Sequence, residues 1–176
     1  FFSVQNSYGQ TAGDFRSNAE GPVAWNSSAS WKIYDGFNWV VTNEYPGQFD
    51  HLPLPKVTIQ SGHSISIAST LTIAEEIGEL QIIGVLILVY CNNRTTKDIA
   101  ITTSLITIEP LGEINFNSNK ITFTLTEPDA IIVIEPTGDI TGSCTHNDEI
   151  YIGTDKFAVC AGAGASGVFT FGEVVA

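Results

Sequence analysis

The stretch ITIEPLGEINF (residues 106–116) is written again, with few changes, as IVIEPTGDITG (residues 132–142). A shift of 26 residues places Ile106 on Ile132 and superimposes the two Glu-Pro-x-Gly segments. In both copies isoleucine alternates with other residues, which is typical of a strand with one buried face. Proline presets φ at the second position of a turn and glycine suits the fourth. Each copy therefore predicts two strands joined by a turn.

A repeat of this length, with strand character, predicts a solenoid. A looser copy is LTIAEEIGELQI (residues 71–82), aligned with Gly78 in the place of Gly112, and the polar stretch at 91–98 is then interpreted as a looped insertion. Inward isoleucines of one coil would lie about 4.8 Å from those of the next. The predicted fold class is all-β, a right-handed parallel β-helix. The alternative is a β-sandwich, which antiparallel hairpins throughout residues 57–152 would favour.

Residues 10–50 differ from the rest because they hold all three tryptophans, Trp25, Trp31 and Trp39. An open solenoid end exposes core and strand edges and needs cover. We therefore expect an N-terminal aromatic cap over residues 10–50, followed by a β-helix over residues 51–176. The tryptophans are then predicted to be buried in the cap, and the alternative is that they stack on sugar rings as a carbohydrate-binding surface.

The segment WKIYDGFNWVV (residues 31–41) predicts the hairpin of this cap. Asp35-Gly36 tolerates the positive φ angles of a two-residue type I′ turn. That turn would pair Tyr34 with Phe37 and place Lys32 opposite Trp39.

The two ends of the chain carry their own predictions. Ser7-Tyr8-Gly9 is a small-x-small triplet after an apolar start, so residues 1–9 are interpreted as the remnant of a signal peptide cut before Gln10. An ordinary extended N-terminus is the alternative. The chain ends FTFGEVVA, with strand character unfinished, which predicts that the β-helix is truncated at its C-terminus.

Composition excludes some classes of partner. The 176 residues are 43% hydrophobic and 15% charged, with a net charge of −12. Nucleic acids and anionic membrane surfaces require clusters of Lys and Arg, so neither is expected as a partner. The richest apolar run, at 82–90, is too short to span a bilayer.

The three cysteines, Cys91, Cys144 and Cys160, form no metal-ligand pattern. In an exported protein Cys144 and Cys160 could form a disulfide. Buried, inert thiols are the alternative.

The 26-residue repeat would also stack acidic residues on neighbouring coils, with Glu109 over Glu135 and Glu113 over Asp139. Like charges on neighbouring strands repel unless solvent or a cation screens them. Calcium accepts carboxylate oxygens in flexible geometry. No Asp-x-Asp pattern accompanies these acids, so the prediction is a weak or absent Ca²⁺ site and no other cofactor.

The segment GDFRSNAEGPVAWNSSASWKIYDGFNWV (residues 13–40), followed by YPG (45–47) and VTIQSGHSISI (57–67), resembles the N-terminal region of large secreted and cell-surface proteins of Bacteroidota. The resemblance covers residues 13–82 and departs from the pattern at Glu20–Val23. It implies export, often by the type IX secretion system, and a β-helical stretch after the motif. It does not imply any chemistry.

The predicted function is a non-catalytic structural or adhesive module of a secreted or cell-surface protein. Its expected partners are other domains of the same chain and surface glycans. The alternative is a carbohydrate-binding or carbohydrate-active β-helix module of a larger enzyme. Catalysis is disfavoured because the two arginines, Arg16 and Arg94, lie outside the repeated strands, and adjacent acids such as Glu75-Glu76 face opposite sides of a strand.

Overall fold

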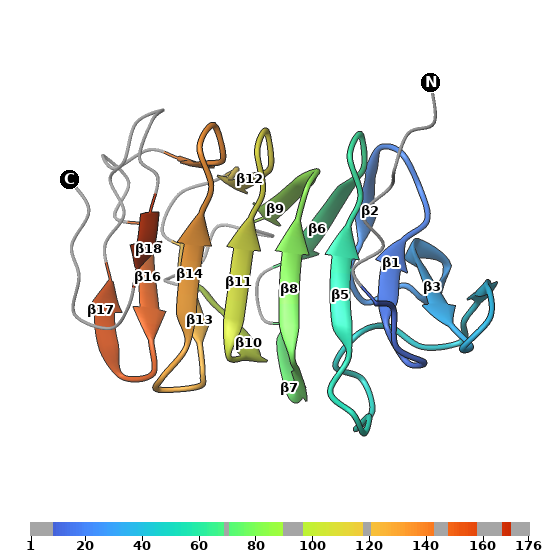
Figure 1. Ribbon diagram of the computed structural model, residues 1–176. Helices are drawn as coiled ribbons and strands as arrows, with labels where there is room; N and C mark the ends of the chain where they lie inside the picture. The colour runs from blue at the N-terminus through green and yellow to red at the C-terminus, as the bar shows by residue number, and fades with distance from the viewer. Residues whose placement is uncertain are drawn as a thin grey trace.

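Strands make up almost all of the regular structure. The computed structural model describes residues 9–68, 71–89, 97–117, 121–142, 148–157 and 167–169. Within these ranges the one helical element is a single 3₁₀ turn, η1 (Ser28–Ser30). The strands form three sheets around one apolar core (Figure 1).

We name the sheets by their place in Figure 1. The front sheet has the order β18 (Gly167–Phe169), β14 (Ile131–Ile134), β11 (Leu105–Ile108), β8 (Glu79–Ile82), β5 (Lys56–Ile59), β1 (Phe15–Ser17), β3 (Trp31–Tyr34), β4 (Trp39–Val41). The top sheet has the order β15 (Asp139–Thr141), β12 (Glu113–Phe116), β9 (Val85–Val89), β6 (Ser64–Ala68), β2 (Pro22–Ala24). The back sheet has the order β17 (Asp155–Phe157), β16 (Glu149–Ile152), β13 (Ile121–Leu125), β10 (Lys97–Thr103), β7 (Thr72–Ile77).

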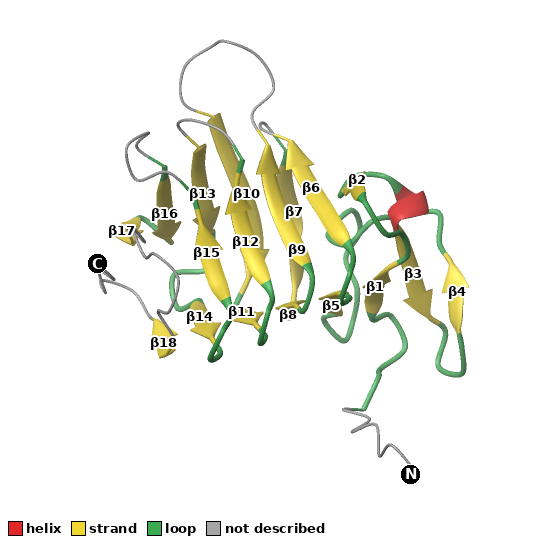
Figure 2. Ribbon diagram, turned by 90° about the horizontal axis from the view of Figure 1, so that it is seen from above, coloured by secondary structure: helices red, strands yellow, loops and turns green. Residues whose placement is uncertain are grey.

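Each coil contributes one strand to each sheet, and successive coils pair in parallel. The chain rises along the front sheet, passes through the top sheet and returns along the back sheet, while advancing from right to left in Figure 1. The view from above shows the top-sheet strands side by side (Figure 2). This path is a right-handed parallel β-helix, which confirms the predicted fold class. The β-sandwich alternative is wrong, since antiparallel pairs occur only at the two ends, at β1–β3–β4, β16–β17 and β14–β18, among the described strands.

The 26-residue echo is the register between two neighbouring coils. Ile106 pairs with Ile132 and Ile108 with Ile134 in the front sheet, and Glu113 pairs with Asp139 in the top sheet. The isoleucines of both copies are buried, with alternate residues facing outward. The repeat therefore encodes the stacking of the core, as predicted.

The repeated Glu-Pro-x-Gly segment is a tight corner between the front and top sheets. Gly112 N donates to Glu109 O (2.8 Å) and Gly138 N donates to Glu135 O (2.8 Å), which closes a four-residue turn on each coil. The third residue has positive φ in both turns, 68° at Leu111 and 73° at Thr137, as a type II turn requires.

The predicted alignment of the looser copy, residues 71–82, is wrong. Leu80 and Ile82 pair with Ile106 and Ile108, and Val85 pairs with Glu113, so Gly84 and not Gly78 precedes the top-sheet strand as Gly112 does. The corner between β8 and β9 is two residues shorter than the corner between β11 and β12. Because of this difference in length, the two coils do not align without a gap. Most of the predicted insertion at 91–98 lies outside the described residues.

The predicted register of the cap hairpin is also wrong. Tyr34 pairs with Trp39 and Lys32 with Val41, so four residues, 35–38, form the loop. The Asp35 carboxylate is the cause, because its Oδ1 accepts hydrogen bonds from Phe37 N (2.8 Å) and Asn38 N (2.7 Å). These bonds stabilise a wider loop than the Asp-Gly pair alone favours.

The hairpin loop is expected to make stability depend on pH. The hydrogen bonds from Asn38 N and Phe37 N lower the pKa of Asp35. The charged form is therefore favoured in the folded state, and its contribution is present above the ordinary pKa of about 4 and is lost as pH falls through the lowered value. The difference in melting temperature between wild type and Asp35→Ala should shrink over that window. The difference in melting temperature between Asp35→Asn and Asp35→Ala should stay constant over the same window, because neither variant has a titratable group at this position. A difference between wild type and Asp35→Ala that stays constant down to the lowest pH would contradict this account.

The N-terminal end of the β-helix is closed by two buried tryptophans and by a loop. Trp25 and Trp31 are fully buried and pack edge to face, with ring centroids 4.9 Å apart. Trp25 Nε1 donates to Pro46 O (3.0 Å), which ties the pair to the loop at 42–55. That loop also covers the edge of β7, where Glu75 N donates to Gly47 O (3.4 Å). The predicted cap is therefore present, and β1 and β2 extend its contact with the coils because they join the front and top sheets in parallel.

Candidate functional site

The three tryptophans lie in two different environments. Trp25 and Trp31 are part of the buried core of the cap, where no ligand could reach their rings. Trp39 is half-buried on the outer face of the front sheet, so its predicted burial in the cap core is wrong. Strand alternation is the reason: Trp39 pairs with Tyr34, which faces outward because Trp31 and Ile33 face the core.

Trp39 packs within an outward-facing cluster. Its ring lies 5.3 Å from that of Tyr34, and the guanidinium carbon of Arg16 lies 4.5 Å from its ring centroid. Arg16 comes from β1 and points outward between the buried residues Phe15 and Ser17. The indole face is thus occupied by a cation, and Trp39 serves to hold Arg16 in place.

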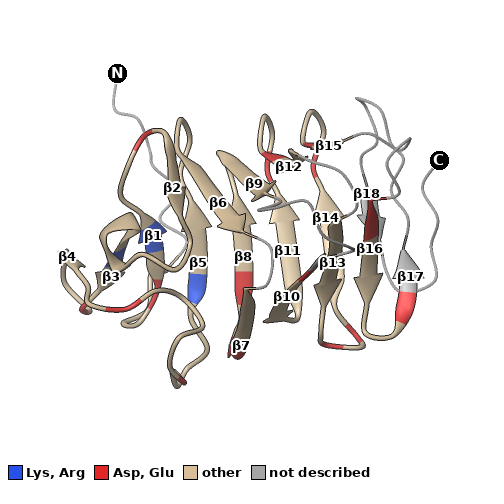
Figure 3. Ribbon diagram, turned by 180° about the vertical axis from the view of Figure 1, so that it is seen from behind, with Lys and Arg blue, Asp and Glu red and all other residues tan. Residues whose placement is uncertain are grey.

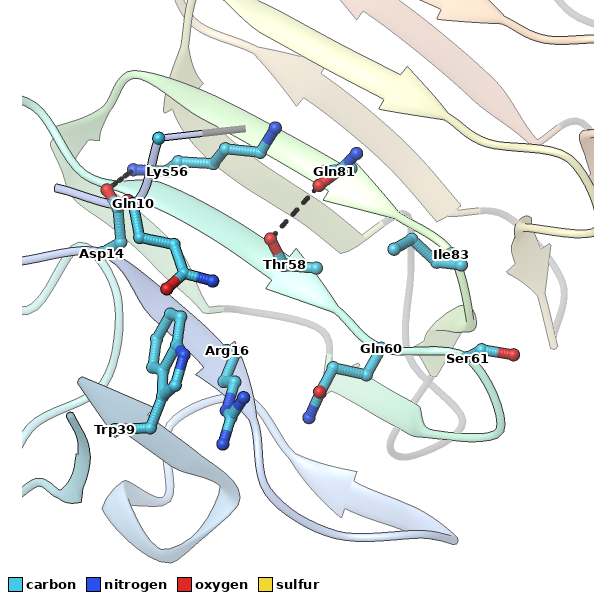
Figure 4. A pocket seen from close by; sticks show the side chains of 11 residues that line it. Gln10, Asp14, Arg16, Trp39, Lys56, Thr58, Gln60, Ser61, Gln81 and Ile83 are labelled. Carbon is cyan, nitrogen blue, oxygen red and sulfur yellow. Dashed lines mark hydrogen bonds between the residues drawn. The ribbon is translucent and has the colours of Figure 1, made fainter. Parts of the chain in front are cut away.

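A pocket of about 420 Å³ opens beside this cluster, where the cap meets the first coils (Figure 4). Figure 4 shows Gln10, Trp39 and Arg16 on one side of it, and Gln60, Ser61 and Ile83 toward the ends of β5 and β8. Its lining residues come from the N-terminal segment and from β1, β4, β5, β8 and the turns that follow β5 and β8: Gly9, Gln10, Asp14, Arg16, Trp39, Lys56, Thr58, Gln60, Ser61, Gln81 and Ile83. Most of these side chains end in an amide or a hydroxyl, or carry a charge.

The floor of the pocket is a row of hydrogen-bonded side chains that crosses the coils. Thr58 Oγ1 donates to Gln81 Oε1 (3.3 Å), and Gln81 Nε2 donates to Glu109 Oε1 (2.6 Å). A second row runs beside it, in which Lys56 Nζ lies 3.1 Å from Glu79 Oε2 and Thr107 Oγ1 donates to Glu79 Oε1 (3.1 Å). These rows hold the floor side chains in fixed positions on a rigid sheet.

The one carboxylate that lines the pocket is already engaged. Asp14 is 7% exposed, and its Oδ2 accepts from Thr11 N (2.7 Å) while its Oδ1 accepts from Lys56 N (2.9 Å). Asp14 thus ties the N-terminal segment to the start of β5. Both of its oxygens accept backbone hydrogen bonds, so Asp14 shapes this end of the pocket.

Three of the seven basic residues lie on neighbouring front-sheet strands at this end of the molecule (Figure 3). They are Arg16 on β1, Lys32 on β3 and Lys56 on β5. Arg16 is partly desolvated, and this burial lowers the pKa of its guanidinium. Arginine nevertheless stays protonated in proteins, so the pocket wall carries a fixed positive charge.

Two of the four acids of the predicted calcium site, Glu109 and Glu113, accept hydrogen bonds from neutral donors. Glu113 Oε1 accepts hydrogen bonds from Asn115 Nδ2 (2.8 Å) and from Thr141 Oγ1, and Glu109 is bound by Gln81 as described. Glu113 and Asp139 stack in register as expected. Across the described ranges no group of three or more His, Cys, Asp or Glu side chains could hold a metal ion.

Two histidines have structural partners. Ser17 Oγ and His63 Nδ1 are 2.8 Å apart, and Ser17 Oγ also accepts from Gln60 N (2.9 Å). Ser17 is fully buried, so this pair fastens β1 to the turn after β5 and offers no accessible nucleophile. His51 Nε2 lies 3.4 Å from Glu44 Oε1 in the cap loop. Cys91, Cys144 and Cys160, with the predicted disulfide, lie outside the described residues, as does most of the predicted signal remnant at 1–9.

Sequence reasoning identified Trp39 but missed the rest of the pocket. Arg16, Thr58 and Gln81 are polar residues that alternate with buried ones on three strands, and nothing in their local pattern separates them from other outward residues. The charge distribution gives no signal either, because the first 56 residues hold five acids beside Arg16, Lys32 and Lys56.

No helix in the described part of the chain is long and apolar enough to cross a membrane. No family model, curated protein or solved structure matches this chain. Its function is therefore inferred from its own geometry.

Proposed function

We propose that this chain is a non-catalytic adhesive module of a secreted or cell-surface protein, and that it binds surface glycans through the pocket beside Trp39. The β-helix is the rigid scaffold of this module. Export and surface location rest on the N-terminal sequence and on the resemblance to Bacteroidota surface proteins. The glycan-binding part rests on the pocket.

The observation that carries the proposal is the chemistry of the pocket lining. Sugars present many hydroxyl groups, each of which both donates and accepts hydrogen bonds. Side-chain amides and hydroxyls do the same, and Gln10, Thr58, Gln60, Ser61 and Gln81 supply them on one surface. A volume of about 420 Å³ falls in the range of small-molecule sites.

The rigidity of the floor supports binding without chemistry. The cross-coil hydrogen bonds of Thr58 and Gln81 fix donors and acceptors before any ligand arrives, which reduces the entropy lost on binding. The lining carboxylate, Asp14, is committed to two backbone N–H groups. The pocket is thus suited to recognition.

Filling the pocket floor should abolish glycan binding and leave the fold intact. Thr58→Tyr places a large side chain in the middle of the floor, on a strand that accepts aromatic residues. Thr107→Tyr is the matched control, because Thr107 also faces outward from the front sheet and also donates one hydrogen bond to a side chain on β8, but lies outside the pocket. On an array of cell-surface polysaccharides, we expect binding by wild type and Thr107→Tyr and its loss in Thr58→Tyr. Equal binding by the two variants would refute the pocket as the site.

A further inference from the structure

Arg16 is the one lining residue whose charge is not balanced within the pocket. Asp14 is bound by backbone N–H groups, and Glu79 lies against Lys56. Within the described ranges no carboxylate lies within ion-pair distance of the Arg16 guanidinium, and its buried Nε has no hydrogen-bond partner. Buried donors are normally satisfied, so an unpaired one calls for an explanation.

The contact with Trp39 accounts for the position of the Arg16 side chain but supplies no partner for its charge. The indole packs on the guanidinium with 4.5 Å between Cζ and the ring centroid, and Tyr34 supports the indole from the neighbouring strand. The guanidinium thus packs against an aromatic ring, and its Nε is buried. A cation that is partly desolvated and has no counter-ion binds an anion more strongly than one fully in water.

We infer that the pocket binds an acidic saccharide and that Arg16 holds its carboxylate. This inference rests on the proposed function of the same pocket. The terminal N–H groups of a fixed guanidinium match the two oxygens of a carboxylate, which a lysine cannot do in the same way. The amides and hydroxyls of Gln10, Thr58, Gln60 and Gln81 then bind the ring hydroxyls beside it.

An acidic saccharide fits this lining better than an acidic peptide. A peptide would bring backbone groups and apolar side chains, yet among the described lining residues only Ile83 and Trp39 have large apolar side chains. The lining instead offers five side chains that can both donate and accept, which suits the dense hydroxyl groups of a sugar.

The test uses calorimetry with tetrasaccharides that contain glucuronate, galacturonate or mannuronate, each paired with its carboxyl methyl ester. We expect at least one acid to bind, with its ester weaker by about tenfold or more, since a charge-assisted contact is lost. Arg16→Gln should weaken binding of the acid to the level of the ester, and Arg16→Lys should restore only part of it. Lys32→Gln is the matched control, because Lys32 lies opposite Arg16 in register but does not line the pocket. It should bind as wild type does, and melting curves should show that all three variants are folded.

The outcomes separate this inference from the proposed function. If acid and ester bind equally, or if Lys32→Gln loses as much affinity as Arg16→Gln, then the role of Arg16 is refuted and glycan binding stands. If a glutamate-rich peptide binds as tightly as the best acid, the saccharide assignment is refuted. If no saccharide of any kind binds, both the inference and the proposed function fail.

Discussion

Gly112→Ala is expected to lower the melting temperature by about 6–12 °C. A Cβ at this position would overlap the carbonyl oxygen of Ile82 in the previous coil. That oxygen cannot retreat, because it accepts the hydrogen bond from Glu109 N (2.9 Å) that begins the same corner. Overpacking against a fixed backbone costs about 3 kcal/mol, and each kcal/mol shifts the melting temperature of a chain of this size by about 2–4 °C.

The neighbouring coil supplies a graded control for this prediction. At Gly138 an added Cβ would lie 2.9 Å from Ile108 O, which is also too close but overlaps far less than at Gly112. Gly138→Ala should therefore destabilise less than Gly112→Ala, as judged by thermal and urea unfolding of both variants. Equal effects, or the reverse order, would show that close approach between coils is not the reason for these glycines.

The close approach of successive coils at these glycines explains why the repeat of residues 106–116 at 132–142 is visible in the sequence. A β-helix demands that one corner be turned in the same way on successive coils, so Pro110 and Gly112 recur as Pro136 and Gly138. The buried isoleucines recur with them because they stack in register. Fold class and the pairing of these two coils followed from sequence for this reason.

Where successive coils differ in corner length, the alignment predicted from sequence is wrong. The corner that ends in Gly84 has two residues fewer than the corner that ends in Gly112. The prediction placed Gly78 there instead and assigned the surplus length to an insertion at 91–98. The cap hairpin failed for another reason. A side-chain acceptor, Asp35 Oδ1, decides the loop, and its bonds to Phe37 and Asn38 are a matter of geometry that residue preference alone does not specify.

The candidate site was the least predictable part. Its wall and floor bring together Gln10 of the N-terminal segment and four residues of the front sheet, Arg16, Trp39, Thr58 and Gln81, from strands that are distant in sequence. Their proximity depends on β1 pairing with β5 on one side and β3 on the other. A repeat-based alignment contains no information on that arrangement, since β1 and β3 precede the repeats.

Trp31→Ala is expected to cost about 3–5 kcal/mol, the range for removing a fully buried tryptophan side chain, and to lower the melting temperature by about 6–20 °C. Trp31 is fully buried against Trp25, and its Nε1 donates to Trp25 O (2.8 Å). Its loss would leave a cavity at the N-terminal end of the core and an unpaired carbonyl. Trp31→Phe should cost less, because it keeps an aromatic ring and loses only the hydrogen bond and part of the volume.

Trp39→Ala is the internal control for the cap. Trp39 is half-buried and contacts Arg16 and Tyr34 outside the core, so its removal should cost only about 1 kcal/mol. Because the cap covers the open end of the solenoid, Trp31→Ala should also promote self-association, which analytical ultracentrifugation would detect as concentration-dependent oligomers. Trp39→Ala should stay as wild type in that measurement. If both variants melt alike, or if Trp31→Ala keeps the melting temperature of wild type, then Trp25 and Trp31 do not form the stabilising closure of this β-helix.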